Sequence, residues 1–238
     1  MAVANQVGVG VLDQIRCGLG AHGVIFLPSL AQGVPTPDIA RELGSAVDAG
    51  AAKDWASCVQ VLRPRSIREA PLNLYSGHFG LDEFPLHTDA ALWVMPPRYF
   101  VLRCVVGSSD VMTTTLSVDV LVSELGMATL RRAVVCPRRA SRNGSACAMP
   151  LLLEGGDLVS IRWDPLFLVP ANQCARTVFA WMADRSRWAK HERKVSLAHP
   201  GDTLVVDNWR TLHGRSRVPD GAAQRVIERV YLACIKDQ

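Results

Sequence analysis

The stretch FPLHTDAALW, residues 84–93, carries a histidine and an aspartate one residue apart, between a proline and an apolar run. In an extended strand alternate side chains point to the same face, so we expect His87 and Asp89 to lie side by side on one strand. An imidazole and a carboxylate without partners would be costly on a buried face. A metal ion, the other member of the pair or water must therefore satisfy them.

A third candidate ligand, His213, lies in DTLVVDNWRTLHGRSRV after a probable strand. Two histidines and one carboxylate that leave coordination positions open form the facial triad typical of non-haem Fe(II) oxygenases. An HxD pair alone also occurs as surface residues or as a single ion pair. The later histidine is what makes the pattern favour a metal site, and the other histidines (His22, His78, His191 and His199) have no comparable context.

Two arginines near the C-terminus indicate a binding site for an anion. In RVIERVYLAC, Arg225 and Arg229 are four residues apart, so on a strand they share one face with Ile227 between them. Arginines that face inward from an apolar strand need anionic partners. Glu228 points to the opposite face and is poorly placed to serve. A dicarboxylate co-substrate beside the iron would match a guanidinium bidentately.

These residues together resemble the iron(II)/2-oxoglutarate-dependent dioxygenases, and specifically the taurine dioxygenase/clavaminate synthase-like (TauD/TfdA) branch. The stretches HTDAALWVMPPRYFVLRC and DNWRTLHGRSRV resemble that branch beyond the ligands themselves, and AHGVIFLPSL resembles its N-terminal strand. The likeness covers most of the chain and is thin between residues 128 and 150.

The resemblance implies an α+β, β-dominated fold, in which helices flank a distorted double-stranded β-helix, a cupin-like jelly-roll core. It implies Fe(II) held by His87, Asp89 and His213, with 2-oxoglutarate and O2 as co-substrates. By position, Arg225 matches the arginine that grips the distal carboxylate of 2-oxoglutarate. Arg229 matches a second arginine, near the proximal carboxylate or the substrate.

A threonine after the HxD strand usually assists co-substrate binding in this family. The sequence offers Thr113, Thr114 and Thr115, and the spacing to the following helix favours Thr113, with Thr115 as a second candidate. The usual Gly-Gly before that threonine is replaced here by Ser108 and Ser109, so the sequence leaves the choice among the three open.

Two stretches resemble segments that border the substrate in some relatives. NLYSGHFG contains Tyr75 and Ser76, and IRWDP contains Arg162 and Asp164. Arg162 could hold a substrate carboxylate, and Asp164 could meet an ammonium or guanidinium group. The alternative is that these two charges pair with each other on the surface. We favour a small zwitterionic substrate, an amino acid or an amino-acid-derived intermediate of natural product biosynthesis.

Two other functions fit parts of the pattern. A nucleic-acid demethylase of the same superfamily would share the triad and the positive charge, but its paired arginines are normally spaced more widely and no base-stacking aromatic platform is evident. Nucleic acid is therefore not the expected partner. A cupin-like protein that binds metal without turnover would not need the paired arginines.

Composition is that of an ordinary globular chain. The 238 residues are 49% apolar and 20% charged, with a net charge of +4, which suits one domain over residues 1–238. We find no signal peptide and no 18-residue apolar run, so no membrane association is expected. The seven cysteines form no CxxC pair, which favours buried reduced thiols in the cytoplasm. The sequence does not indicate an oligomeric state.

The elements that must position these side chains follow from periodicity and turn residues. Helices are expected at residues 11–19, 36–44, 117–125 and 172–189, the last being the longest. Strands are expected at 23–27, 59–62, 98–106, 110–116, 158–163, 194–197, 203–207 and 225–234, with His213 between the last two. The arginine-rich segment 128–150 is expected to be exposed.

Overall fold

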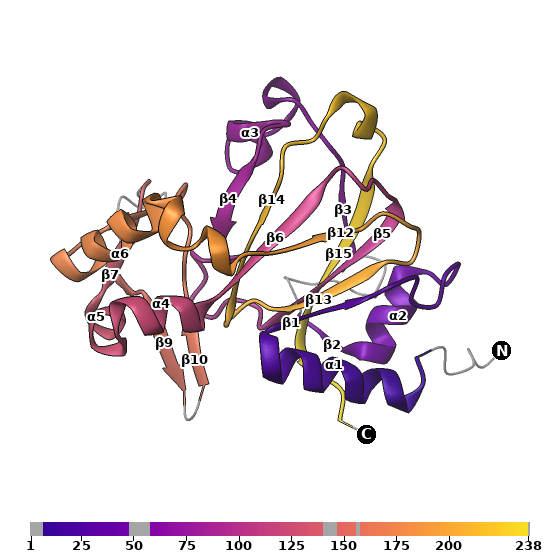
Figure 1. The fold of residues 1–238 in the computed structure, drawn as a ribbon, viewed down its shortest axis with the longest axis horizontal. Coiled ribbons are helices and arrows are strands. Elements are labelled where there is room, and N and C mark those ends of the chain that lie inside the picture. Colours follow the sequence, from indigo (N-terminus) through magenta and orange to yellow (C-terminus); the bar gives the residue numbers. More distant parts are fainter. Residues whose placement is uncertain (1–6, 48–57, 140–146, 156–157, 238) are drawn as a thin grey trace.

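Two antiparallel sheets form the centre of the computed structural model, which describes residues 7–47, 58–139, 147–155 and 158–237 (Figure 1). The larger sheet has the strand order β1-β13-β5-β15-β2, with β3 also paired to β15. Its strands are β1 (Val24–Leu27), β2 (Gly44–Ala46), β3 (Gln60–Leu62), β5 (Tyr99–Val106), β13 (Thr203–Asp207) and β15 (Val226–Ile235). The smaller sheet has the order β12-β6-β14-β4 and consists of β4 (Phe84–His87), β6 (Met112–Ser117), β12 (Arg193–Ser196) and β14 (Thr211–Arg215).

Alternation along the strands of the larger sheet separates two apolar layers. One layer lies between the sheets and contains Phe100, Leu102, Cys104, Leu197, Leu204, Val206 and Ile227. The Phe100 ring of β5 lies 4.6 Å from the His213 ring of β14, centroid to centroid, so the two sheets meet at that contact. The intervening residues, such as Val101, Val205 and Val230, pack in a second layer with helical residues on the other face.

Helices α1 (Val9–His22) and α2 (Thr36–Leu43) supply that second layer and lie along the larger sheet in Figure 1. Helix α1 is capped by Gly23, whose φ of 68° is left-handed, and a Cβ there would collide with the Thr211 hydroxyl. Helix α2 has a proline in its first turn and is followed directly by Gly44, as expected. Within the described residues, no helix is long and apolar enough to cross a membrane.

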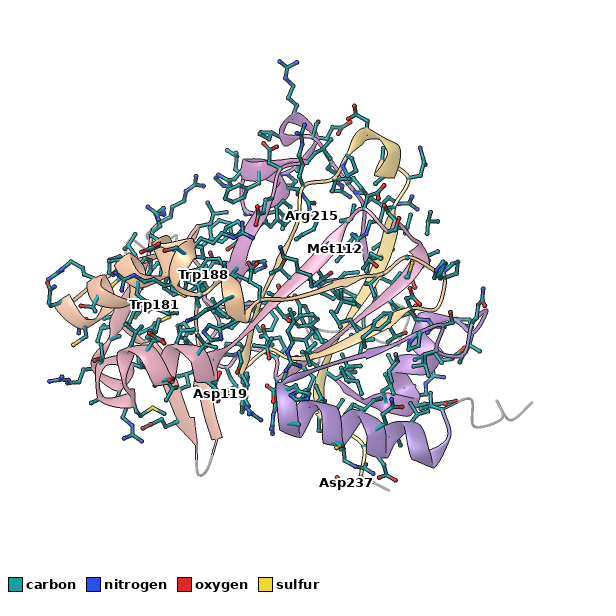
Figure 2. All side chains as sticks on the ribbon, viewed as in Figure 1. Met112, Asp119, Trp181, Trp188, Arg215 and Asp237 are labelled. Carbon is teal, nitrogen blue, oxygen red and sulfur yellow. The ribbon has the colours of Figure 1, made fainter. Side chains whose placement is uncertain are left out.

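A second lobe lies beside the smaller sheet and shares an apolar core with it, to which Trp181 and Trp188 contribute (Figure 2). Its helices are α4 (Val118–Leu125), α5 (Met127–Arg132) and α6 (Gln173–Ala183), and its strands are β7 (Val134–Pro137), β8 (Met149–Pro150), β9 (Leu152–Gly155), β10 (Leu158–Ile161) and β11 (Leu168–Pro170). Helix α4 begins as predicted, because the Ser117 hydroxyl accepts the N–H of Asp119. The short helices are α3 (Ser76–Phe79), η1 (Ile67–Glu69), η2 (Arg185–Arg187), η3 (Ala189–His191) and η4 (Asp220–Ala222).

Three expectations about these elements are wrong. Residues 128–150 are not simply exposed, because α5 and β7 bury Leu130 and Val135 completely; residues 140–146 lie outside the described part of the chain. Helix α6 ends at Ala183 and is shorter than α1, because the Asp184 side chain accepts the N–H of Ser186 and starts a separate 3-10 turn. His213 lies within a strand, β14, that was not predicted.

The cysteines match the expectation only in part. None of the seven cysteines, all of which lie in the described part of the chain, forms a disulfide, but only Cys104 is fully buried, whereas Cys17, Cys147 and Cys234 are exposed. Burial raises the pKa of the Cys104 thiol to about 11, so this side chain behaves as a small apolar residue of the core.

Candidate metal centre

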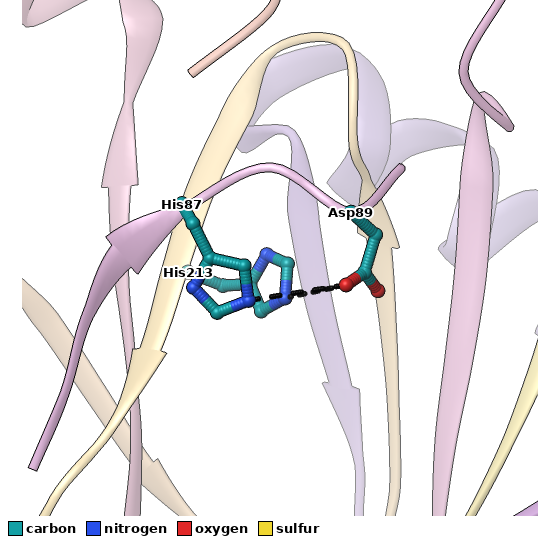
Figure 3. Close-up of side chains that lie close together, drawn as sticks. All are labelled: His87, Asp89 and His213. Atoms are coloured by element: carbon teal, nitrogen blue, oxygen red, sulfur yellow. Dashed lines mark ion pairs between the residues drawn. The ribbon is translucent and has the colours of Figure 1, made fainter. Parts of the chain in front are cut away.

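The two histidines and the aspartate of the predicted triad meet between the sheets (Figure 3). Nε2 of His87 lies 3.9 Å from Oδ1 of Asp89, and Nε2 of His213 lies 3.7 Å from the same oxygen. His87 and His213 stand directly opposite each other in the pairing of β4 with β14. All three residues are at most 8% exposed. They are the only such group of potential metal ligands that the described residues form.

The protonation of His87 suits a metal ligand. Its Nδ1 lies 2.9 Å from the Pro85 carbonyl oxygen, so Nδ1 carries the proton and the lone pair of Nε2 faces Asp89. Burial and the neighbouring His213 lower the pKa of His87 to about 3, which keeps the imidazole neutral. Two imidazole nitrogens and a carboxylate oxygen that converge in this way fit a divalent transition metal such as Fe(II).

The expectation that His87 and Asp89 share one strand is wrong. Strand β4 ends at His87, and the chain turns away because the N–H of Thr88 donates to the Trp163 carbonyl and Ala90 has a φ of 54°. Asp89 therefore reaches the two imidazoles from a loop, as the trace in Figure 3 shows.

Arg229 contacts Asp89 directly. Its Nη1 donates to Oδ2 of Asp89 at 2.8 Å, and its Nε and Nη2 donate to Oε1 of Gln60. Burial alone would raise the pKa of Asp89, but Arg229 and the two imidazoles hold that pKa well below its ordinary value. The carboxylate is thus ionised, with Oδ2 bound by Arg229 and Oδ1 turned toward the histidines.

Arg225 lies immediately before β15 and has no charge partner within the described residues. It is 9% exposed, and its buried Nε forms no hydrogen bond. Burial lowers the pKa of Arg225 to about 10, and burial together with the charge of Arg225 does the same to Arg215. Glu228 points to the other face of the sheet, as predicted, and is paired there with Arg103 of β5. The surroundings of Arg225 therefore favour an incoming anion.

The register of the smaller sheet separates the three threonines. Thr115 is paired with His213 and Thr113 with Arg215, so both side chains share the face of the triad. Thr114 points to the opposite face, where it lines a cavity of about 460 Å³ under α6, together with Leu86, Trp163 and Phe179. Thr113 and Thr115 are the threonines that face the site.

Of the predicted substrate residues, Tyr75 contacts the triad and Asp164 contacts Tyr75. The Tyr75 ring stacks on His87 with centroids 4.1 Å apart, and its hydroxyl donates to Oδ1 of Asp164 at 2.8 Å. The N–H groups of Leu166 and Phe167 donate to the same oxygen. Burial raises the pKa of Asp164. Ser76 is half-buried at the start of α3.

Arg162, which was expected to hold a substrate carboxylate, binds main-chain carbonyls. It is 2% exposed, and its Nη1 donates to the carbonyls of Ala91 and Trp93 at 2.7 and 2.8 Å. Its Nη2 donates to the Val94 carbonyl at 3.3 Å. It makes no ion pair with Asp164, and both side chains are buried, so the surface pair considered above does not form. The Arg162 guanidinium holds the loop that follows Asp89.

Solved structures of oxygenases share this fold. A taurine dioxygenase from Burkholderia xenovorans matches with a TM-score of 0.68 and 15% identity over 100% of this chain and 86% of its own. An asparagine oxygenase in complex with Fe(II), 2S,3S-3-hydroxyasparagine and succinate matches with a TM-score of 0.65 and 17% identity over 93% of this chain and 77% of its own. The non-heme iron oxygenase OrfP, in complex with Fe and alpha-ketoglutaric acid, matches with a TM-score of 0.64 and 20% identity over 94% of this chain and 80% of its own.

No protein-family model and no curated protein matches the sequence. The structural likenesses show that this chain has the antiparallel, β-rich fold of these oxygenases, which confirms the fold relationship expected from the sequence.

Proposed function

We propose that this protein is an Fe(II)- and 2-oxoglutarate-dependent oxygenase that hydroxylates, or otherwise oxidises, an unactivated C–H bond of a small molecule. The observation that carries the proposal is the buried triad of His87, Asp89 and His213, together with a buried Arg225 that has no charge partner among the described residues. This arrangement lies in a fold shared with oxygenases whose structures contain iron with alpha-ketoglutaric acid or with succinate. A protein that only stored metal would gain nothing from the buried cation.

The finer fold assignment is part of this proposal. We infer that the six-stranded and four-stranded sheets are the two halves of a distorted double-stranded β-helix, with the helices flanking it in one domain over residues 1–238. The contact between Phe100 and His213 supports this, because it joins the inner faces of the two sheets. Seven cysteines without a disulfide among them support work in the reducing cytoplasm.

Each side chain has a separate task in the proposed reaction. His87, Asp89 and His213 would hold Fe(II) on one side and leave its other positions open. Arg225 would bind the distal carboxylate of 2-oxoglutarate, with Thr113 or Thr115 beside it. Arg229 already binds Asp89, so its task is first to hold that carboxylate, and only then to contact a co-substrate or substrate. When bound, Fe(II) and 2-oxoglutarate supply the activation of O2 that oxidises the C–H bond.

For the substrate we propose an amino acid or an amino-acid-derived molecule. Tyr75 stacks on the ligand His87 and binds Asp164, so Asp164 lies close enough to the metal to hold a substrate cation. All three hydrogen bonds that the Asp164 carboxylate accepts within the described residues reach Oδ1. This leaves Oδ2 for an ammonium or guanidinium group. Two oxygenases of this fold have been solved with (3S)-hydroxy-L-Arg or hydroxyasparagine bound.

The purified protein, loaded with Fe(II) in air, should convert 2-oxoglutarate to succinate, and this conversion should couple to a gain of one oxygen atom in the substrate. Free amino acids, amino-acid-derived scaffolds, terpenoids and methylated oligonucleotides can be compared by mass spectrometry. Succinate formation with none of them, and none in their absence, would contradict the oxygenase assignment. Metal binding without succinate would instead indicate a cupin-like binding protein, and product from the oligonucleotides a demethylase.

Asp164→Asn should lower kcat/KM for the best amine-bearing substrate by more than tenfold, because the variant loses the charge that pairs with the substrate cation. Slow succinate formation without substrate should persist, since it does not need the substrate cation that Asp164 would bind. Asp110→Asn, at an exposed position, is the matched control. Turnover that is indifferent to Asp164→Asn, or confined to an uncharged terpenoid, would contradict the proposed substrate class and leave the oxygenase assignment standing.

A further inference from the structure

The position of Asp89 depends on a loop, because β4 ends two residues earlier. A strand fixes each residue through its ladder of hydrogen bonds, and a loop must obtain the same constraint from side chains. The carboxylate of Asp89 is bound by Arg229, but that contact does not place its main chain.

One buried side chain holds the main chain of Asp89. Asn208 is 1% exposed, and its Oδ1 accepts the Asp89 N–H at 2.8 Å. Its Nδ2 donates to the Asp89 carbonyl at 3.1 Å and to the Pro97 carbonyl at 2.9 Å. The orientation of the amide is fixed, because an N–H needs an acceptor and two carbonyls need a donor. Asn208 thus ties both ends of the loop that follows β4.

Asn208 is itself held rigidly. It follows β13 directly, and its N–H donates to the Arg98 carbonyl at 2.7 Å, next to the start of β5. Strand β14, which carries His213, begins three residues later. Asn208 therefore connects the loop of one candidate ligand to the turn that precedes the strand of another.

We propose that Asn208 is a positioning residue that holds Asp89 in place for the metal and so sets the metal affinity of the site. The proposal rests on the proposed metal centre. Without the amide, the N–H and the carbonyl of Asp89 would be buried without partners, and the loop would shift to find them. A shift of the loop moves the Asp89 carboxylate away from the two imidazoles, which stay on their own strands.

Asn208→Ala should weaken equilibrium Fe(II) binding by about 10- to 100-fold, the usual effect of losing a residue that orients a metal ligand. Binding is measured anaerobically by calorimetry on the full chain, so the readout does not depend on turnover. Asn172→Ala is the matched control. Asn172 also binds main chain on both sides of its amide, at the N–H groups of Val134 and Ala175 and the Arg132 carbonyl, but it lies in the second lobe. Its removal should leave Fe(II) affinity within twofold of the wild type.

A double-mutant cycle separates positioning from general destabilisation. In an Asp89→Ala background there is no carboxylate to position, so Asn208→Ala should change the remaining Fe(II) affinity by less than twofold. Asn208→Ser, which leaves room for water at the lost contacts, serves the same cycle if the alanine variant does not fold. Wild-type affinity in the Asn208 variants, or the same loss in the Asp89→Ala background, would overturn the proposal and leave the metal centre intact. A wild-type protein that binds no Fe(II) would overturn both.

Discussion

Replacing His213 with alanine should abolish Fe(II) binding and all succinate formation while the protein stays folded. In the proposed site His213 would supply one of three protein ligands, and Asp89 with His87 alone would offer an incomplete site for a metal that prefers this triad. The fold should survive, because the buried Nδ1 of His213 has no hydrogen-bond partner to lose and the ring contacts mainly Phe100 and His87. We expect a loss of about 0.5–3 kcal/mol in the free energy of unfolding, as for most single substitutions.

The measurement is the weak visible charge-transfer band that Fe(II) and 2-oxoglutarate give together when both are bound under anaerobic conditions. It should vanish in His213→Ala and persist in the control His191→Ala, which changes an exposed histidine in η3. Far-UV circular dichroism shows whether each variant is folded. A band of undiminished strength in His213→Ala would remove this residue from the site and would require a different third ligand.

The sequence predicted the residues of the site better than the reasons for their positions. His87, Asp89 and His213 were found by type and spacing, and the structure brings them together although one of them lies on no strand. The alternation of side chains along a strand correctly predicted that Asp89 lies near His87. It did so for the wrong reason, because Asp89 lies in a loop and not on the strand. The loop is shaped by Asn208 and Trp163, 119 and 75 residues away in the chain, and local patterns carry no information about such contacts.

Charged residues show the same division. Glu228 and the inward face of β15 followed from a period of two, which is local. The partners of Arg229 and Arg162 could not be predicted from this local period. Gln60 reaches Arg229 through the pairing of β3 with β15, and Arg162 meets a loop of the chain near residue 93. A buried arginine has the same sequence signature whether it binds a substrate or main-chain carbonyls.

The prediction that the arginine-rich segment after α4 is exposed was wrong for a related reason. The basic side chains of Arg131 and Arg132 are exposed, as expected, but the nearby Leu130, Ala133 and Val135 are completely buried. Three apolar residues among many charges are too few to give a clear helix or strand periodicity. These three residues are buried because they pack into the core of the second lobe, and that core is assembled from segments far apart in the chain.

Replacing Arg225 with methionine should have opposite effects on stability and on co-substrate binding. Burial lowers the pKa of Arg225 to about 10, below its unfolded value, so the charged form is disfavoured in the folded protein. At neutral pH the group is protonated in both states, and the full cost remains; it is relieved only as pH rises past about 10. Methionine keeps the aliphatic stem and removes the charge. We therefore expect the variant to unfold at a higher temperature than the wild type when no 2-oxoglutarate is present.

With 2-oxoglutarate the order should reverse. The wild type gains a partner for Arg225, and a ligand at a hundred times its Kd stabilises a protein by about 2.7 kcal/mol. The variant should gain little, because losing one member of a buried charge pair costs about 2–5 kcal/mol, well over tenfold in affinity. Melting curves with Fe(II) held anaerobically, across a 2-oxoglutarate titration, measure both effects. Arg217→Met, at a side chain 79% exposed, is the matched control and should follow the wild type. An unchanged 2-oxoglutarate dependence in Arg225→Met would show that another cation binds the co-substrate, and a lower melting temperature without it would show that Arg225 already has a partner in the folded chain.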